Sequence, residues 1–323
     1  MKRTLFVLAF GIAVPLCAQN PNSGNGKGPE DLSGYSTSAP PMLGIHWARD
    51  FTPNGRVIED ASPSNGAKAR SPLMTYHGGK IMTTAVIQSI FWGTSWGSYT
   101  GDKITGIDSF YTGHSGSNYA KTVDEYTGSN GQVGATTTFP ISTITNAPVP
   151  HVIDTTVAAG GNNSSVILAE VCKMVPSPDP GGNGYYAVYS DVKRGNAGYC
   201  AWHSAGTCGG RPVQFAFFFN LDGDAGCDPV DTSGLHSQGL AALANVSAHE
   251  LSEARSDPAS PGAWYDASGN ENGDKCAWTF GAPLVTFTNG SQWKLQGEWS
   301  NAAYTAGTGY ANSSGQKGCL SGL

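Results

Sequence analysis

Apolar residues in the middle of the chain gather in short runs of the kind that form buried strands. Residues 74–93 contain a β-rich apolar run suited to a central strand. Residues 184–192 (GYYAVYSDV) and 213–223 (VQFAFFFNLDG) are aromatic and β-branched runs bounded by glycine-rich turns, and both predict buried strands. Residues 136–150 predict a further strand, interrupted by prolines. We therefore expect a sheet of several strands.

Two segments between these runs combine polar and apolar residues in the manner of helices. Residues 102–127 predict polar-apolar helical segments. Residues 164–175 (SSVILAEVCKMV) predict an amphipathic helix whose N-cap is Ser164 or Ser165. Helices are therefore expected to alternate with the first three predicted strands along the sequence.

The helical period is clearest in residues 235–258, LHSQGLAALANVSAHELSEARSDP. The residues that lie close to one stripe of this helix are Leu240, Leu243, Ala244, Ser247 and Leu251. Pro258 disfavours a helical conformation at Asp257, so the helix is expected to end near Arg255 or Ser256.

Composition favours a loop-rich and strand-rich fold over a helical bundle, because 44 of the 323 residues are glycine and only 13% are charged. With the segment pattern, this predicts a single α+β domain over residues 72–323. We expect a mixed β-sheet, a buried active-site-like helix and disulfide-pinned loops, in a zincin-like arrangement. The net charge of −6 and the scattered Lys and Arg residues argue against a nucleic-acid-binding surface.

Residues 1–18 have the pattern of a secretory signal peptide. Lys2 and Arg3 precede an apolar run, and small residues allow cleavage near Ala18. The mature protein is therefore expected to be secreted, either extracellular or periplasmic. No later stretch approaches the roughly 20 apolar residues of a transmembrane helix. Residues 19–71, rich in Asn, Gly, Ser and Pro, predict a flexible leader or pro-segment.

Of the seven cysteines, Cys17 falls within the signal peptide and six remain. An even number in an exported chain indicates disulfides. The pairs that we expect are Cys172–Cys200, Cys208–Cys227 and Cys276–Cys319. A zinc site built from cysteines is less favoured, because the chain has no CxxC pair.

The expected helix over 235–258 carries the string HELSE, with His249 and Glu253 four residues apart and therefore on one face. The zinc-protease pattern HExxH uses the same frame, in which two helical residues bind zinc and a glutamate takes a proton from water. Here Glu253 replaces the second histidine, and glutamate is itself a zinc ligand. The pattern predicts that Glu250 is the general base of a zinc metallohydrolase.

A third metal ligand is expected downstream, in the acidic and glycine-rich segment WYDASGNENGDKC. Glu271 is our first choice, because it follows Glu253 by 18 residues, a separation similar to that of gluzincins. The alternates are Asp257, Asp274 and His203. With zinc bound, the chain would be a secreted peptidase acting on a peptide or protein substrate.

Other interpretations compete with a zinc enzyme. HELSE can be merely the solvated polar surface of a helix. Asp222, Asp224 and Asp228 follow a strand in a glycine-rich turn that suits calcium, and the loop 266–274 can hold calcium instead of supplying a zinc ligand. The chain can then be a non-catalytic extracellular binding or signalling module with a structural metal, calcium or zinc. Its tryptophans would bind cell-wall glycan: Trp92, Trp96, Trp264, Trp278, Trp293 and Trp299.

Several separated motifs resemble the EXORDIUM-like, phosphate-induced protein family. They are YHGG at Tyr76 to Gly79, CAWH at Cys200 to His203 with Ala201 in the glycine position, HELSE at His249 to Glu253, and ENGDKC at Glu271 to Cys276. The resemblance extends over roughly residues 74–319. It implies secretion and supports grouping His249, Glu253, Glu271 and Asp274 in one site, and it leaves the reaction open.

Overall fold

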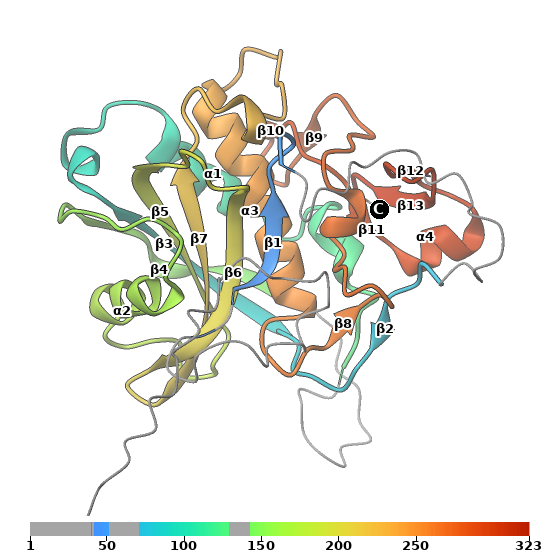
Figure 1. Ribbon diagram of the computed structural model, residues 1–323, viewed down its shortest axis with the longest axis horizontal. Coiled ribbons are helices and arrows are strands. Elements are labelled where there is room, and N and C mark those ends of the chain that lie inside the picture. Colours follow the sequence, from blue (N-terminus) through green and yellow to red (C-terminus); the bar gives the residue numbers. More distant parts are fainter. Residues whose placement is uncertain (1–39, 41, 52–70, 129–142, 323) are drawn as a thin grey trace, which may run out of the picture.

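The computed structural model describes residues 40, 42–51, 71–128 and 143–322. A six-stranded mixed sheet forms its centre, in the order β1-β6-β7-β5-β3-β4 (Figure 1). The strands β7, β5, β3 and β4 run parallel to one another, whereas β6 is antiparallel to β7 and β1 is antiparallel to β6. The strands are β1 (Leu43–Trp47), β3 (Thr84–Trp92), β4 (Thr143–Asp154), β5 (Gly184–Lys193), β6 (Tyr199–Cys208) and β7 (Arg211–Asn220).

The apolar runs correctly predicted the parallel part of the sheet. β5 and β7 are continuously buried over most of their length, as expected for parallel strands covered on both faces. β3 lies between β4 and β5, which confirms an interior strand. β6 was not predicted, because its sequence YCAWHSAGTC mixes polar and small residues. It is joined to β7 through Gly209 and Gly210, whose φ angles of 57° and 80° suit a two-residue hairpin turn.

Helices cover both faces of the sheet. Alternate residues of β6 show this, because His203 faces the helix α3 whereas Gly206 lies against Leu168 of α2. α1 packs beside α3, on the face of the sheet that His203 points to (Figure 1). The helices are α1 (Lys103–His114), α2 (Ser164–Met174), α3 (Gln238–Ser256) and α4 (Asn301–Ala306), with 3-10 turns η2 (Thr94–Ser98), η3 (Ala120–Val123), η4 (Ala225–Cys227) and η5 (Asp274–Cys276).

Helix ends follow local chemistry. α3 ends at Ser256, as the following Asp257-Pro258 pair predicted. The N-cap of α2 is Asn163 rather than Ser164 or Ser165. Its side chain accepts the backbone N–H groups of residues 165 and 166, so the cap lies one residue earlier than predicted.

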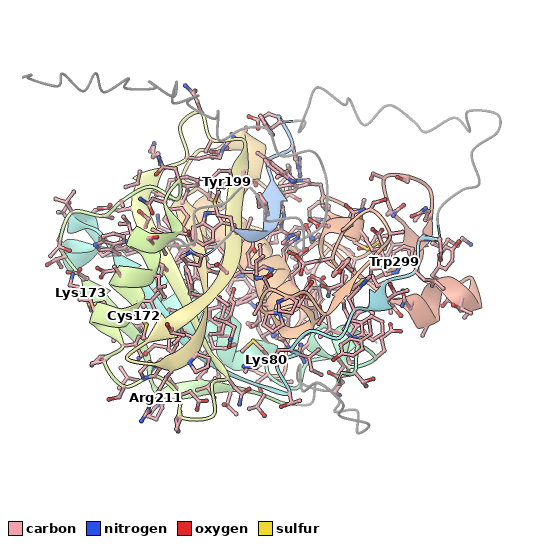
Figure 2. All side chains as sticks on the ribbon, turned by 60° about the horizontal axis from the view of Figure 1, so that its bottom comes forward. Lys80, Cys172, Lys173, Tyr199, Arg211 and Trp299 are labelled. Carbon is pink, nitrogen blue, oxygen red and sulfur yellow. A yellow bond between two sulfur atoms is a disulfide. The ribbon has the colours of Figure 1, made fainter. Side chains whose placement is uncertain are left out.

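The C-terminal part forms a second, smaller core beside α3 (Figure 1). It is built from short strands of two to four residues that are joined by loops. These strands are β2 (Thr75–Tyr76) with β8 (Trp264–Tyr265), and β11 (Glu298–Trp299), β13 (Lys317–Leu320) and β12 (Tyr310–Ala311). The pair β9 (Val285–Thr286) and β10 (Gln292–Trp293) instead packs into the main core, to which Val285 and Trp293 belong. Trp299 lies on the opposite side of the molecule from Cys172 (Figure 2).

Two disulfides lie in the part built on the large sheet and one lies in the C-terminal core, and two of the expected pairings were wrong. The observed pairs are Cys172–Cys208, Cys200–Cys227 and Cys276–Cys319. Cys200 and Cys208 lie near opposite ends of β6, about 26 Å apart at the usual rise per residue of a strand. Cys172 on α2 lies beside the hairpin end, so it reaches Cys208. The Cys276–Cys319 pair was predicted correctly.

The expected leader, residues 19–71, needs a correction. β1 lies inside this segment and pairs with β6, so the folded domain includes residues before 72. Residues 1–18, the predicted signal peptide, lie outside the described residues. Among the described residues, no helix is long and apolar enough to cross a membrane. The α+β class with a mixed sheet is confirmed.

Candidate metal centre

The helix α3 is buried on all sides although much of its surface is polar. Ser237 caps its N-terminus through the backbone N–H of Leu240, and Asp102 in turn accepts hydrogen bonds from Ser237. Every residue from Gly239 to Ser256 is buried. A buried polar group is costly unless it is paired, so each polar side chain of this helix needs a partner from the sheet or from the C-terminal core.

Glu253 is the centre of the polar contacts. Its Oε1 accepts the backbone N–H of Asp274 at 2.9 Å. The Nε2 of His249 lies 3.1 Å from the same oxygen, too poorly aligned for a hydrogen bond. Its Oε2 has no hydrogen-bond partner and lies 3.8 Å from Nε2 of His203 on β6. One oxygen of Glu253 is therefore tied to the protein, while the other faces the sheet.

Around that free oxygen lies a group that we call the buried cluster: His203, Glu250, Glu253 and Glu271. Glu271 Oε2 lies 3.5 Å from His203 Nε2. Both nitrogens of His203, both oxygens of Glu250 and Oε1 of Glu271 lack a hydrogen-bond partner, and no side chain of the cluster is more than 1% exposed. Among the described residues, no Lys or Arg forms an ion pair with these carboxylates.

The Gln296 side chain determines the tautomer of His249, that is, which ring nitrogen carries the proton. Its Oε1 accepts the N–H of Trp278 at 3.3 Å and its Nε2 donates to the carbonyl of Gly273 at 3.0 Å, so the amide orientation is defined by backbone partners. The same Nε2 donates to His249 Nδ1 at 2.9 Å. Because Nδ1 accepts a hydrogen bond, neutral His249 carries its proton on Nε2, which points toward Glu253.

Burial dominates the electrostatics of the site. It lowers the pKa of both His203 and His249 to about 3, so both rings are neutral near pH 7. It raises the pKa of Glu253 to about 8. Burial, followed by the charge of Glu253, also holds the pKa values of Glu250 and Glu271 well above their usual range. Several carboxyls therefore keep a proton unless a cation replaces it.

Within the part of the chain that the structure describes, two sets of side chains have the spacing of metal ligands, and Glu253 belongs to both. The first is His203, Glu250 and Glu253, and the second is His249, Glu253 and Asp274; the ligand atoms of each set lie within 4.8 Å of one another. Tetrahedral zinc places its ligand atoms about 3.4 Å apart, close to the 3.5 and 3.8 Å around His203 Nε2. His203 has a free lone pair, whereas the proton on His249 Nε2 blocks coordination there. The first set, extended by Glu271, fits a cation better.

The predicted site residues therefore separate into two groups. One region contains His249, Glu250, Glu253 and Glu271 and the alternates Asp274 and His203. The HELSE frame predicted the proximity of its helical members, His249 and Glu253. Asp257 lies outside both sets of candidate ligands, and its Oδ1 accepts the N–H of Ala263.

The three aspartates expected to suit calcium have other partners. Asp222 pairs with Lys103, and Asp224 pairs with Arg194. Asp228 accepts the backbone N–H of Val230. In the described part of the chain they form no set with metal-ligand spacing.

Three residues near the cluster escaped sequence reasoning. His46 of β1 donates from Nε2 to Gln296 Oε1 at 3.0 Å, and its ring lies 4.1 Å from the ring of His249. Gly44 passes against His203 and Glu253, where a Cβ would come within 2.2 Å of both side chains. A lone His or Gly in a polar leader and a lone Gln in a loop carry no spacing signal, so only the fold could bring them together.

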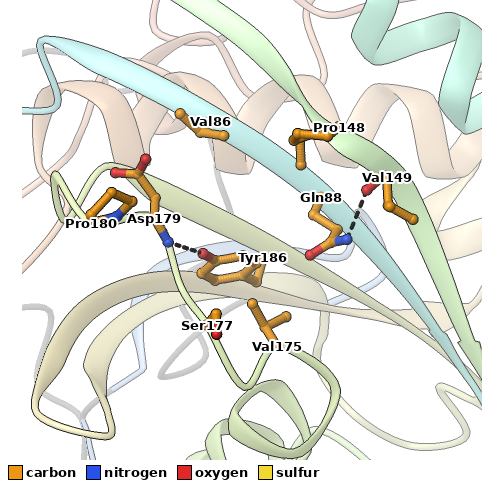
Figure 3. A pocket seen from close by; sticks show the side chains of 10 residues that line it. Val86, Gln88, Pro148, Val149, Val175, Ser177, Asp179, Pro180 and Tyr186 are labelled. Carbon is orange, nitrogen blue, oxygen red and sulfur yellow. Dashed lines mark hydrogen bonds between the residues drawn. The ribbon is translucent and has the colours of Figure 1, made fainter.

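Four of the six tryptophans considered for glycan binding are core residues, each at most 6% exposed: Trp92, Trp96, Trp293 and Trp299. The other two, Trp264 and Trp278, are partly buried. A cavity of about 460 Å³ lies elsewhere, beside β3, β4 and β5, and shares no residue with the buried cluster (Figure 3). Its Tyr186 hydroxyl accepts the N–H of Asp179 at 2.9 Å. The buried cluster is therefore the stronger candidate for chemistry.

Comparisons with known proteins found no matching family model, no matching curated protein and no matching solved structure. The resemblance to the phosphate-induced family therefore stays a prediction, and the case for function depends on the geometry above.

Proposed function

We propose that this protein is a secreted zinc-dependent hydrolase of the peptidase type, with a zincin-like arrangement around α3. The observation that supports this proposal most is the buried cluster, in which imidazole and carboxylate atoms without partners converge at metal-ligand spacing. Unpaired buried charges are costly, so a divalent cation would stabilise the folded chain.

The proposed ligands are His203 Nε2, Glu253 Oε2 and Glu271 Oε2. This keeps two of the ligands expected from the sequence and replaces His249 by the alternate His203. His249 and the N–H of Asp274 orient Glu253 from its other oxygen, as outer partners commonly do for ligating carboxylates.

Glu250 is the proposed general base. In the metal-free protein burial and the charge of Glu253 raise the pKa of Glu250, and the backbone N–H of His46 opposes this shift. Glu250 lies beside Glu253 and His203, so a bound cation would favour the ionised carboxylate that a base requires. When bound, zinc would polarise the scissile carbonyl and acidify the attacking water. Glu250 would accept a proton from the attacking water as the water oxygen bonds to the scissile carbon, and it would return that proton to the leaving amine as the carbon–nitrogen bond breaks.

The burial of the cluster favours one alternative, a non-catalytic extracellular module with a structural metal. Structural zinc sites are closed, and the cluster has no exposed side chain. In that case the ion would only join the sheet, α3 and the C-terminal core.

The variant Glu250→Gln separates the two functions. As a base, Glu250 is required for turnover but not for binding, so the variant should hold zinc and lose casein hydrolysis by about 100-fold or more. The matched control is Glu298→Gln, which changes a buried carboxyl that already accepts a hydrogen bond from Tyr119. Full activity in Glu250→Gln, or loss of its zinc, would reject the assignment. Zinc without any turnover in the unaltered protein would favour the structural module.

A further inference from the structure

The edge strand β1 covers the centre of the molecule, and it buries Leu43 and His46 there. It has five residues, and among the described residues it pairs only with β6. Its register shifts twice, once between Leu43 and Ile45 and once between His46 and Trp47. Short and irregular edge strands have few ladder hydrogen bonds to hold them, so β1 can separate from β6 at low cost compared with the interior strands.

β1 nevertheless closes one side of the buried cluster. The backbone of Gly44 runs so close to His203 Nε2 and Glu253 Oε2 that a Cβ would lie 2.2 Å from each atom. His46, two residues later, contacts His249 and donates to Gln296. No side chain of the cluster is exposed while this strand is in place, and its backbone occupies the space beside the proposed ligands.

We propose that the β6 edge is a binding site for an extended peptide, and that β1 is an internal occupant of that site. That a peptide bound there would be a substrate rests on the proposed function, because the peptide would lie beside the proposed hydrolytic centre. Extended peptides commonly bind by adding a strand to a sheet edge, where main-chain hydrogen bonds provide affinity and side-chain pockets provide selectivity.

The contacts of β1 indicate which peptides the edge accepts. Leu43 is only 3% exposed, so its position takes a buried apolar side chain. The next position must be glycine, because a side chain there would collide with His203 and Glu253. The substrate class is therefore an extended peptide with an apolar residue followed by glycine, and the chain's own Leu43-Gly44 pair has this pattern.

Gly44→Ala tests this occupancy directly. The added methyl group collides with the cluster and Gly44 has a φ of +29°, so the variant strand should leave the β6 edge. The probe is a fluorescent synthetic peptide with the sequence of residues 42–48, MLGIHWA. The tethered strand competes with this probe at high effective concentration in the unaltered protein, so Gly44→Ala should bind it roughly tenfold more tightly or better. Val157→Ala, which truncates a side chain that is 81% exposed and lies outside β1, is the control and should leave binding unchanged.

Equal, weak probe binding by folded Gly44→Ala and by the unaltered protein would overturn the inference. If the variant does not fold, hydrogen exchange in the unaltered protein decides: the N–H groups of β1 should exchange much faster than those of β7, and equal protection would overturn the inference. Probe binding is measured without turnover. Tight binding to Gly44→Ala without hydrolysis by any form would therefore reject the proposed enzyme and leave the peptide site standing.

Discussion

Two groups of buried polar side chains face α3, and they differ in completeness. On the sheet side of the helix, the hydroxyl of Tyr189 lies 2.8 Å from Ser247 Oγ and 2.9 Å from the hydroxyl of Tyr111, so these groups satisfy one another. One turn later, the buried cluster brings together three carboxyls and one imidazole with few partners. The same helix thus contacts a finished network, the three hydroxyls that satisfy one another, and an unfinished one, the buried cluster, whose polar atoms have few partners.

The difference shows what kind of partner the cluster lacks. Hydroxyls both donate and accept, so three of them can form a closed chain of hydrogen bonds. The carboxyl and imidazole atoms of the cluster lie close together but form no hydrogen bonds with one another, so they do not satisfy one another. A cation supplies what all four side chains need. Substitutions in the buried cluster should therefore change ion binding. Substitutions among the three hydroxyl groups should change the free energy of unfolding alone.

The largest expected effect comes from His203→Asn. This variant removes a proposed ligand that has no other hydrogen-bond partner, so zinc affinity should fall by more than about 100-fold. His249→Asn is the matched substitution on the opposite side of Glu253, and as an orienting residue it should cost only about 10-fold to 100-fold. Zinc titration monitored by calorimetry measures both. If His249→Asn abolished binding and His203→Asn did not, His249 would be the ligand.

Two disulfides give the next largest effect and separate stability from ion binding. Cys276–Cys319 and Cys172–Cys208 close loops of 43 and 36 residues, so removing either pair by double Ala substitution should cost about 4 kcal/mol. Only the first pair lies next to the loop that carries Glu271. Denaturant unfolding should show similar losses for the two variants, whereas zinc affinity should fall only without Cys276–Cys319. Equal zinc affinities would argue that Glu271 is not a ligand.

The stability of the metal-free protein should depend on pH. The folded pKa of Glu253, about 8, exceeds its ordinary value of 4.5, so the folded chain holds this proton more tightly than the unfolded chain. The associated stability is fully present below pH 4.5 and is lost as the pH rises through about 8. The loss should be on the order of a few kcal/mol. Thermal unfolding in a chelator should show a falling Tm over this window, and zinc should flatten the curve. A falling curve that zinc left unchanged would count against the site.

The smallest effect is expected at the finished network. Tyr189→Phe removes the hydroxyl that joins Tyr111 and Ser247, and should cost about 1–3 kcal/mol by leaving buried hydroxyls unpaired. Denaturant unfolding measures the loss, and zinc affinity should remain that of the unaltered protein. A large change in affinity would show that the two networks are coupled through α3.

Sequence patterns predicted the parts of this fold that depend on local periodicity. β5, β7 and α3 carry long runs of one period, and Pro258 correctly marked the end of α3. β6 and β1 were missed because their sequences are short, polar or rich in small residues, and tertiary pairing decides their conformation. The disulfide of Cys172 was predicted incorrectly for the same reason, since its partner depends on where β6 lies.

The candidate site was predicted in part. The i, i+4 spacing of His249 and Glu253 correctly placed both on one face of a helix, and the acidic loop correctly brought Glu271 nearby. Sequence alone could not show that Gln296 donates to His249 Nδ1. That hydrogen bond favours His203 over His249 as the proposed ligand. That hydrogen bond depends on backbone partners from separate loops, at Trp278 and Gly273.

Zinc titration of the purified protein, followed by calorimetry and thermal unfolding, tests the central claim most directly. The buried cluster predicts about one tightly bound zinc ion per chain and a rise in stability of about 2.7 kcal/mol at a free zinc concentration of 100 times Kd. Loss of both effects in His203→Asn would place the ion at the cluster. A folded protein that binds no divalent cation, with Tm independent of zinc, would contradict the account.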